Sequence, residues 1–183
     1  MLTLFKSLVR SRLEFGCEVW NPFLKKDILL LEQIQRSFTN KINGVKDLDY
    51  WDRLKSLNLL SLQRRREKLI LAHVWKIANG IYPNSIDLNF KLHKRSNALR
   101  AVLRPLPKTR GKLLTTFENS FIVNAPKLWN VLPAPVTQTK LLSCFVHELE
   151  SFLSKVPDQP PLPGYPYMNN NSLIEQCAQL GQL

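Results

Sequence analysis

The sequence has few of the residues that most catalytic motifs need. Its 183 residues include six glycines, none adjacent to another, and three cysteines far apart in the chain. Isolated glycines exclude a Gly-rich phosphate-binding loop, which needs several glycines within a few residues. An odd number of distant cysteines argues against a disulfide scaffold and favours a reducing compartment. We therefore expect an intracellular protein, cytoplasmic or nuclear, that is not secreted.

Metal-binding and catalytic patterns are equally scarce. The three histidines lie far from the cysteines and match no zinc spacing. The only close carboxylates are Asp47 and Asp49, with Asp52 nearby, and helix capping explains Asp49 and Asp52 better than a two-metal site does. We expect no catalytic residue, no metal site and no cofactor. The chain by itself is not expected to be an enzyme.

Long hydrophobic runs are also missing, because no stretch approaches the roughly 18 apolar residues of a spanning helix. We therefore expect no membrane partner. Hydrophobic residues still make up 44% of the chain, which is enough for a folded core and excludes a wholly disordered protein.

Acidic residues are in short supply, and this shortage is local. The chain has 26 Lys or Arg against 14 Asp or Glu, for a formal charge of +12. Counted by segment, residues 1–60 carry +3, residues 61–112 carry +11 and residues 113–183 carry −2. Nearly all of the excess therefore lies in one central segment. A cationic patch of this kind favours a polyanionic partner such as nucleic acid.

Apolar residues recur mostly with helical spacing, which predicts a mainly α fold. In the first helix these residues are Leu4, Phe5, Leu8, Val9, Leu13, Phe15 and Val19, and Asn21-Pro22 ends it. A second helix, capped by Asp27, carries the stripe Ile28, Leu31, Ile34, Phe38 and Ile42. A short third helix has Asp49 as its N-cap, and a fourth runs from Ser61 to Asn79.

Four segments follow from these patterns. They are a helical bundle over 1–80, an irregular basic connector over 81–112 with short strands near 86–92 and 99–103, a C-terminal pair of helices over 113–155, and a Pro/Asn-rich disordered tail over 156–183.

The fourth helix begins with an unusual distribution of charge. Arg64, Arg65, Arg66 and Lys68 occupy its first two turns, where the helix dipole prefers acidic groups. Each exposed cation there costs about 0.3–1 kcal/mol at low salt, and a bound phosphate would reverse that sign. A solvated face with tolerated charges explains the same pattern equally well. The nucleic-acid and solvated-face interpretations both stay open from sequence.

Basic residues of the central segment are the candidate binding site. They are Arg64, Arg65, Arg66, Lys68, Lys91, Lys94, Arg95, Arg100, Arg104, Lys108, Arg110 and Lys112. No ordered array of aromatic residues accompanies them, so stacking on bases is not indicated. We expect contacts to the phosphate backbone without sequence readout.

Several short motifs, taken in order, resemble one protein family. They are Lys6–Pro22, Leu24–Ile28, Leu31–Thr39, Leu54–Leu62, Thr109–Gly111, Phe121–Pro133 (with Leu128-Trp-Asn-Val-Leu-Pro133 the most distinctive part), Pro160–Tyr165 and Asn169–Leu173. Together they resemble the region after the palm in reverse transcriptases of non-LTR retrotransposons, of the jockey and chicken-repeat type. The resemblance covers nearly the whole chain. It implies the thumb and C-terminal extension of an RNA-directed DNA polymerase, which grip the primer–template duplex.

The resemblance also has gaps. The family often has Pro where Ser11 stands, and acidic residues where Gln63 and Arg64 stand. The palm motif, the fingers and the endonuclease of the family are absent from the sequence. The chain is therefore expected to be a truncated fragment that binds at most an RNA–DNA hybrid or duplex through its backbone. The alternatives are a helical protein-interaction module, which could self-associate through exposed apolar surface, and a non-functional relic of a transposable element.

Overall fold

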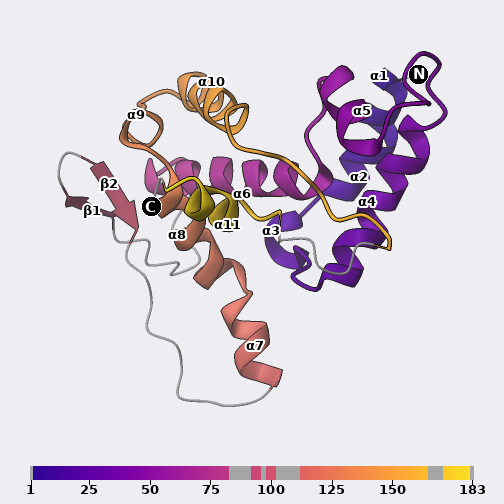
Figure 1. Ribbon diagram of the computed structural model, residues 1–183. Helices are drawn as coiled ribbons and strands as arrows, with labels where there is room; N and C mark the ends of the chain where they lie inside the picture. Colours follow the sequence, from indigo (N-terminus) through magenta and orange to yellow (C-terminus); the bar gives the residue numbers. More distant parts are fainter. Residues whose placement is uncertain (1, 83–91, 96–97, 102–111, 165–170, 182–183) are drawn as a thin grey trace. The chain divides into compact units, whose positions relative to one another are not determined.

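The computed structural model confirms a mainly α protein (Figure 1). It describes residues 2–82, 92–95, 98–101, 112–164 and 171–181. The helices are α1 (Leu2–Leu4), the π-helix η1 (Phe5–Arg10), α2 (Ser11–Glu14), α3 (Cys17–Trp20), α4 (Lys25–Thr39), α5 (Tyr50–Ser56), α6 (Leu62–Ala78), α7 (Lys112–Glu118), α8 (Phe121–Val131), α9 (Ala134–Thr137), α10 (Leu142–Leu153) and α11 (Leu173–Gln179). Two short strands, β1 (Leu92–Arg95) and β2 (Ala98–Ala101), form an antiparallel pair.

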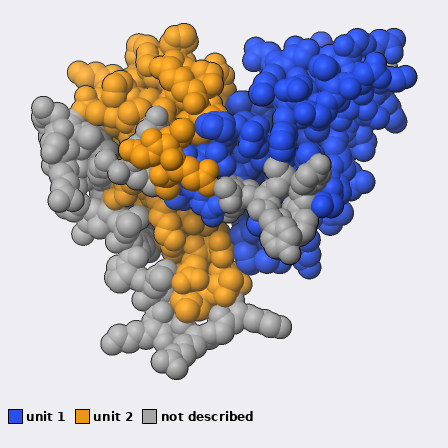
Figure 2. Space-filling model, in the orientation of Figure 1, with its two compact units in different colours: residues 1–67, 157–176 blue, residues 68–156, 177–183 orange. Residues whose placement is uncertain are grey.

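The chain divides into two compact units, which Figure 2 colours separately. Unit 1 comprises residues 1–67 and 157–176, and unit 2 comprises residues 68–156 and 177–183. This division differs from the four consecutive segments expected from sequence. Its first boundary lies inside α6, and part of the expected tail belongs to unit 1.

The N-terminal helical segment is interrupted where the sequence has a glycine. Gly16 adopts the left-handed conformation with φ of 64°, after an extended Phe15. Glycine reaches this conformation at no steric cost, so the chain turns there and restarts as α3. At the other end of the segment, Phe5 stacks on Phe38 of α4 with ring centroids 4.2 Å apart.

Helix α4 buries a face that matches its predicted apolar stripe only in part, since Ile28 belongs to both. Its buried residues are Ile28, Glu32, Gln35 and Thr39, spaced four, three and four apart. Ile34 of the predicted stripe is exposed. The predicted cap is also wrong, because Leu24 is the N-cap and Asp27 lies within the first turn. Both faces have helical spacing, so spacing alone predicts the helix but not its orientation.

Two predicted helix starts are confirmed by their hydrogen bonds. Asp49 accepts a bond from the Asp52 backbone nitrogen at the start of α5, at 2.9 Å. The Ser61 hydroxyl accepts one from the Arg64 backbone nitrogen at the start of α6, at 3.0 Å. Each cap satisfies one of the amide donors that a helix N-terminus leaves without a partner.

Unit 2 is built around aromatic side chains. The Phe145 ring of α10 lies 5.8 Å from the Trp75 ring of α6 and 6.0 Å from the Trp129 ring of α8, stacked on both. Leu149 and Leu153 of α10 are also buried. In the same unit, the Asn130 side chain exchanges two hydrogen bonds with the Ala101 backbone, of 2.8 and 3.0 Å, as a neighbouring strand would.

The expectation of a disordered tail is wrong for the residues described there. Asn171 and Leu173 are buried, and α11 begins at Leu173. Ser172 caps this helix, because its hydroxyl accepts a hydrogen bond from the Glu175 backbone nitrogen at 3.3 Å. Among the described residues, no helix combines the length and apolarity needed to cross a bilayer.

Candidate functional site

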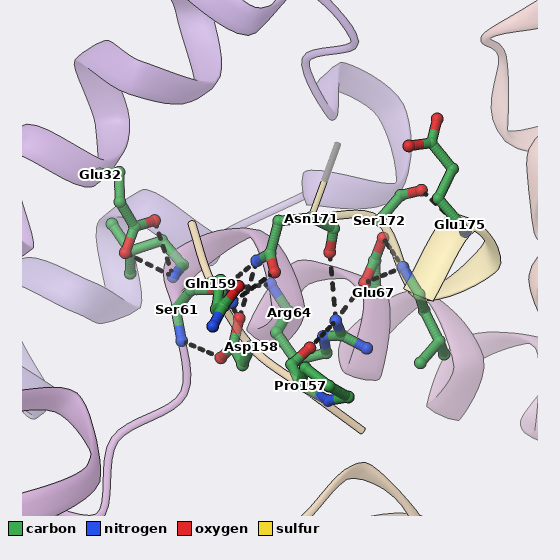
Figure 3. Close-up of polar contacts among 12 residues, drawn as sticks. Glu32, Ser61, Arg64, Glu67, Pro157, Asp158, Gln159, Asn171, Ser172 and Glu175 are labelled. Atoms are coloured by element: carbon green, nitrogen blue, oxygen red, sulfur yellow. Dashed lines mark hydrogen bonds and ion pairs between the residues drawn. The ribbon is translucent and has the colours of Figure 1, made fainter. Parts of the chain in front are cut away.

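The start of α6 is surrounded by carboxylates. Leu62 donates its backbone N–H to the Glu32 carboxylate, at 3.0 and 3.3 Å to the two oxygens. Ser61 donates its backbone N–H and its hydroxyl to the two oxygens of Asp158, each at 2.7 Å. These acceptors satisfy free amides and place negative charge at the positive end of the helix dipole. The start of α6, where the sequence suggested that a phosphate could bind, therefore binds carboxylates of the protein itself (Figure 3).

Arg64 connects α6 to two residues of the C-terminal part of the chain, Pro157 and Asn171. Its side chain is fully buried, and Nη2 donates to the carbonyl oxygens of Pro157 and Asn171, at 3.0 and 3.1 Å (Figure 3). The Glu67 carboxylate lies 3.7 Å from its Nε. A buried guanidinium needs such acceptors and a countercharge, because an unpaired charge is costly to bury.

Asn171 and Glu67 complete this polar cluster. The Asn171 amide donates to Asp158 at 2.7 Å and to the Ser61 hydroxyl at 3.3 Å, and its oxygen accepts from the Gln159 backbone at 2.7 Å. Glu67 accepts the Leu173 backbone N–H at the start of α11, at 3.0 and 3.2 Å. We call Glu32, Ser61, Arg64, Glu67, Asp158 and Asn171 the α6 cluster.

Burial changes the acidity of two members of the α6 cluster. It raises the pKa of Glu32 and that of Glu67 to about 7 in each case. Desolvation is the largest cause, since it penalises the charged carboxylate, while the Tyr50 hydroxyl lowers the pKa of Glu32 and Arg64 lowers that of Glu67. Glu32 and Glu67 therefore take up protons as the pH falls through about 7.

Arg65, Arg66 and Lys68 also have protein partners. Arg65 makes a bidentate ion pair with Glu14, including a 2.8 Å bond from Nη2, and Lys68 pairs with Glu150 in unit 2. Arg66 is fully buried and donates Nε to Asn21 at 2.9 Å, with its guanidinium 5.9 Å from the Trp20 ring centroid. Its Nη1 and Nη2 have no hydrogen-bond partner among the described residues.

These contacts correct the predicted face at the start of α6. Arg64 and Arg66 are interior side chains, so neither reaches a phosphate in this structure. Arg65 and Lys68 are partly exposed but already paired with carboxylates. The solvated-face interpretation is wrong for the two buried arginines as well. What sequence reasoning missed is that Glu32, Asp158 and Asn171 would supply acceptors from distant parts of the chain.

The other predicted site residues lie from Lys91 onward. Lys94 and Arg95 stand in β1 and Arg100 in β2, where His93 is opposite Arg100 and Arg95 is opposite Ala98. Lys112 begins α7. Lys91, Arg104, Lys108 and Arg110 lie outside the described residues. The structure thus brings three of the predicted cations together on one short β-ribbon.

The described residues offer no constellation for metal binding. No group of three or more His, Cys, Asp or Glu among them is placed to hold an ion. Cys17 is fully buried, and burial raises the pKa of its thiol to about 12. A thiol of that acidity is almost entirely protonated at neutral pH, as expected of a structural cysteine.

Comparison with known proteins gives one relationship of modest strength. The chain is similar to an uncharacterized protein of Caenorhabditis elegans, with 28% identity over 146 residues that cover 72% of each protein. No family model matches the chain, and no solved structure matches it.

Proposed function

We propose that the chain is the thumb and C-terminal extension of a reverse transcriptase of the non-LTR retrotransposon type, and that it holds nucleic acid by its phosphate backbone. The ordered motifs from Lys6 to Leu173 support the family. The chain is not expected to polymerise DNA alone, and its place of action is intracellular. Its partner is an RNA–DNA hybrid or a duplex.

One observation carries the binding proposal. Residues 88–112 contain eight Lys or Arg and no Asp or Glu. The cations at the start of α6 have carboxylate or carbonyl partners, whereas no acidic residue stands among these eight. Cations with few competing acids are suited to neutralising phosphates, which supply most of the affinity in binding without sequence readout. The binding segment is therefore shifted toward the β1–β2 ribbon, away from Arg64–Lys68.

Fluorescence anisotropy tests this proposal. The full chain is titrated into labelled RNA–DNA hybrids and DNA duplexes of unrelated sequence, at several salt concentrations. If about five cations contact phosphates, log affinity should fall with log salt with a slope of about −4 to −5 on DNA duplexes. Similar affinity for unrelated sequences is expected. No binding at low salt by the folded chain would contradict the proposal.

Charge variants locate the contacts. Lys94→Gln, Arg95→Gln and Arg100→Gln combined should weaken binding to all sequences and flatten the salt slope by about two to three. The matched control combines Lys46→Gln, Lys55→Gln and Lys155→Gln, which removes the same charge from exposed positions elsewhere. If both triple variants lose the same affinity, overall charge and not this segment determines binding.

A further inference from the structure

The β1–β2 ribbon of unit 2 has two faces, and its register assigns each residue to one of them. Successive residues of a strand belong to opposite faces, and residues that pair across an antiparallel ribbon share a face. The pairs are Leu92 with Ala101, His93 with Arg100, Lys94 with Leu99 and Arg95 with Ala98. One face therefore carries Leu92, Lys94, Leu99 and Ala101. The other, which we call the arginine face, carries His93, Arg95, Ala98 and Arg100.

Ala101 shows which face is covered by the rest of unit 2. It is 5% exposed, and helices α8 and α9 lie against β2. Asn130 of α8 accepts the Ala101 backbone N–H at 2.8 Å and donates to its carbonyl oxygen at 3.0 Å, which holds this end of the ribbon on the helix. The face that contains Ala101 is therefore the inner one, and the arginine face is on the side away from α8 and α9.

The sequence of the two strands agrees with this assignment. The inner face has two leucines and an alanine, whereas three of the four residues on the arginine face are polar. Alternation of this kind is typical of an antiparallel ribbon that is covered on one face only. Lys94 is the exception, because it is a cation on the inner face. The three predicted cations of the ribbon are therefore not equivalent.

The arginine face brings positive charge together over a small area. Arg95 and Arg100 are diagonal neighbours across the ribbon, which places their Cα atoms about 7–8 Å apart, and His93 is directly opposite Arg100. No Asp or Glu occurs on either strand. Neighbouring like charges destabilise a sheet, and an anion bound between them reverses that effect.

We propose that the arginine face alone binds the phosphate backbone, through Arg95 and Arg100 with His93 as a third contact, and that Lys94 takes no part. This inference rests on the proposed nucleic-acid function and adds the side of the ribbon that holds the backbone. A guanidinium binds two phosphate oxygens at once, and a neutral imidazole donates one N–H. His93 is a binding residue that the charge pattern of the sequence did not indicate.

Single substitutions in the full chain test the proposal by fluorescence anisotropy with a DNA duplex and an RNA–DNA hybrid. Arg95→Gln and Arg100→Gln should each weaken binding about fivefold to tenfold at low salt and flatten the salt slope on the duplex by about one. Lys94→Gln is the matched control, because it removes the same charge from the same ribbon. It should keep the affinity within about twofold and leave the slope unchanged. His93→Ala should weaken binding about twofold to threefold at pH 7.5, with little change of slope.

A variant that conserves charge separates binding from a structural role. Arg95→Lys with Arg100→Lys keeps both cations but loses the bidentate geometry. It should lose about twofold to fivefold in affinity and keep the salt slope. A loss as large as that of Arg95→Gln with Arg100→Gln would mean that the two arginines act through the fold, and would overturn the proposal.

The assignment of the faces has a test without nucleic acid. Leu99 shares the inner face with Ala101, so Leu99→Gln places an amide on the covered side and should lower the urea midpoint of the chain. Arg100→Gln, one residue further along β2, should leave the midpoint unchanged. Equal midpoints for the two variants, or a greater loss from Arg100→Gln, would overturn the assignment.

The outcomes distinguish this inference from the proposed function. If the unaltered chain binds neither nucleic acid, the proposed function is wrong and this inference falls with it. If the chain binds and Lys94→Gln weakens binding as much as Arg95→Gln and Arg100→Gln do, the proposed function stands and the arginine face is wrong. Binding that none of the three substitutions weakens would also overturn the inference, because the backbone would then be held elsewhere.

Discussion

Both units have a hydrophobic core, but they differ in how many polar side chains they bury. Among the described residues, eleven of the twelve buried polar or charged residues belong to unit 1, and only Thr137 belongs to unit 2. Eleven of the fifteen exposed large hydrophobic residues also belong to unit 1. Unit 2 instead packs Trp75, Trp129 and Phe145 together.

This difference has a physical consequence for each unit. The buried polar side chains of unit 1 are held by hydrogen bonds and ion pairs, and a buried polar group that loses its partner costs more free energy than the bond contributed. Aromatic packing in unit 2 depends on shape and area, and carries no charge. Unit 1 should therefore respond sharply to single polar substitutions and to pH, and unit 2 should not.

The largest effect is expected at Arg64. Arg64→Met removes the donor to Pro157 and Asn171 and leaves Glu67 without its nearest cation. Breaking a buried pair in this way should cost about 3–5 kcal/mol of unfolding free energy. Urea denaturation followed by circular dichroism measures the loss. The partly exposed Lys68, tested as Lys68→Met, should cost no more than about 1 kcal/mol, and equal losses would contradict the contrast between them.

The next effect is a dependence of stability on pH. Glu32 and Glu67 have pKa values of about 7 in the folded chain, above their ordinary value of 4.5. The folded state therefore holds protons that the unfolded state releases, so stability is highest below about pH 4.5 with respect to these groups and falls as pH rises to about 7. Both carboxyls contribute to this fall in stability with the same sign.

Glu67→Gln sharpens the pH test. Glutamine keeps an acceptor for the Leu173 amide but does not titrate. The fall in stability between pH 5 and pH 7.5 should therefore become shallower in this variant, as measured by urea denaturation at each pH. An unchanged pH profile would show that Glu67 does not titrate in this range.

A smaller effect is expected in unit 2. Phe145→Leu removes the stacking of one ring on Trp75 and Trp129 and leaves a small cavity. We expect a loss of about 1–3 kcal/mol that is the same at pH 5 and pH 7.5. Hydrogen exchange should show the loss in α8 and α10. A loss of unfolding free energy that varied with pH would show that the stability of unit 2 also depends on titrating groups.

Local signals predicted the helices well. Ser61 and Asp49 were correct N-caps because a cap is a contact over three residues. A helix N-cap signal of the same kind, Ser172 followed three residues later by Glu175, is present at the start of α11. The high Pro and Asn content of the segment led instead to the prediction of a disordered tail. Composition describes an average over a segment, so it gave no sign that Asn171 is buried and hydrogen-bonded to Asp158 and Gln159.

The α6 cluster could not be predicted from local pattern. Ser61 and Asp158 are 97 residues apart, and Asn171 is 107 residues from Arg64. A polar residue on a helix is expected at the surface unless its partners are known, so Glu32 and Gln35 gave no sign of burial. The partners of Arg64 and Arg66 are also distant in the sequence, which is why both residues were predicted to face a ligand.

We expect the cations at the start of α6 to stabilise the fold and those of the β1–β2 ribbon to bind nucleic acid. Anisotropy with one RNA–DNA hybrid at low salt compares two double variants that each remove two charges, Arg65→Gln with Lys68→Gln and Lys94→Gln with Arg95→Gln. We expect the first pair to keep its affinity within about twofold and the second to lose about tenfold. A greater loss of affinity from the first pair, in a folded protein, would show that the cations at the start of α6 bind nucleic acid.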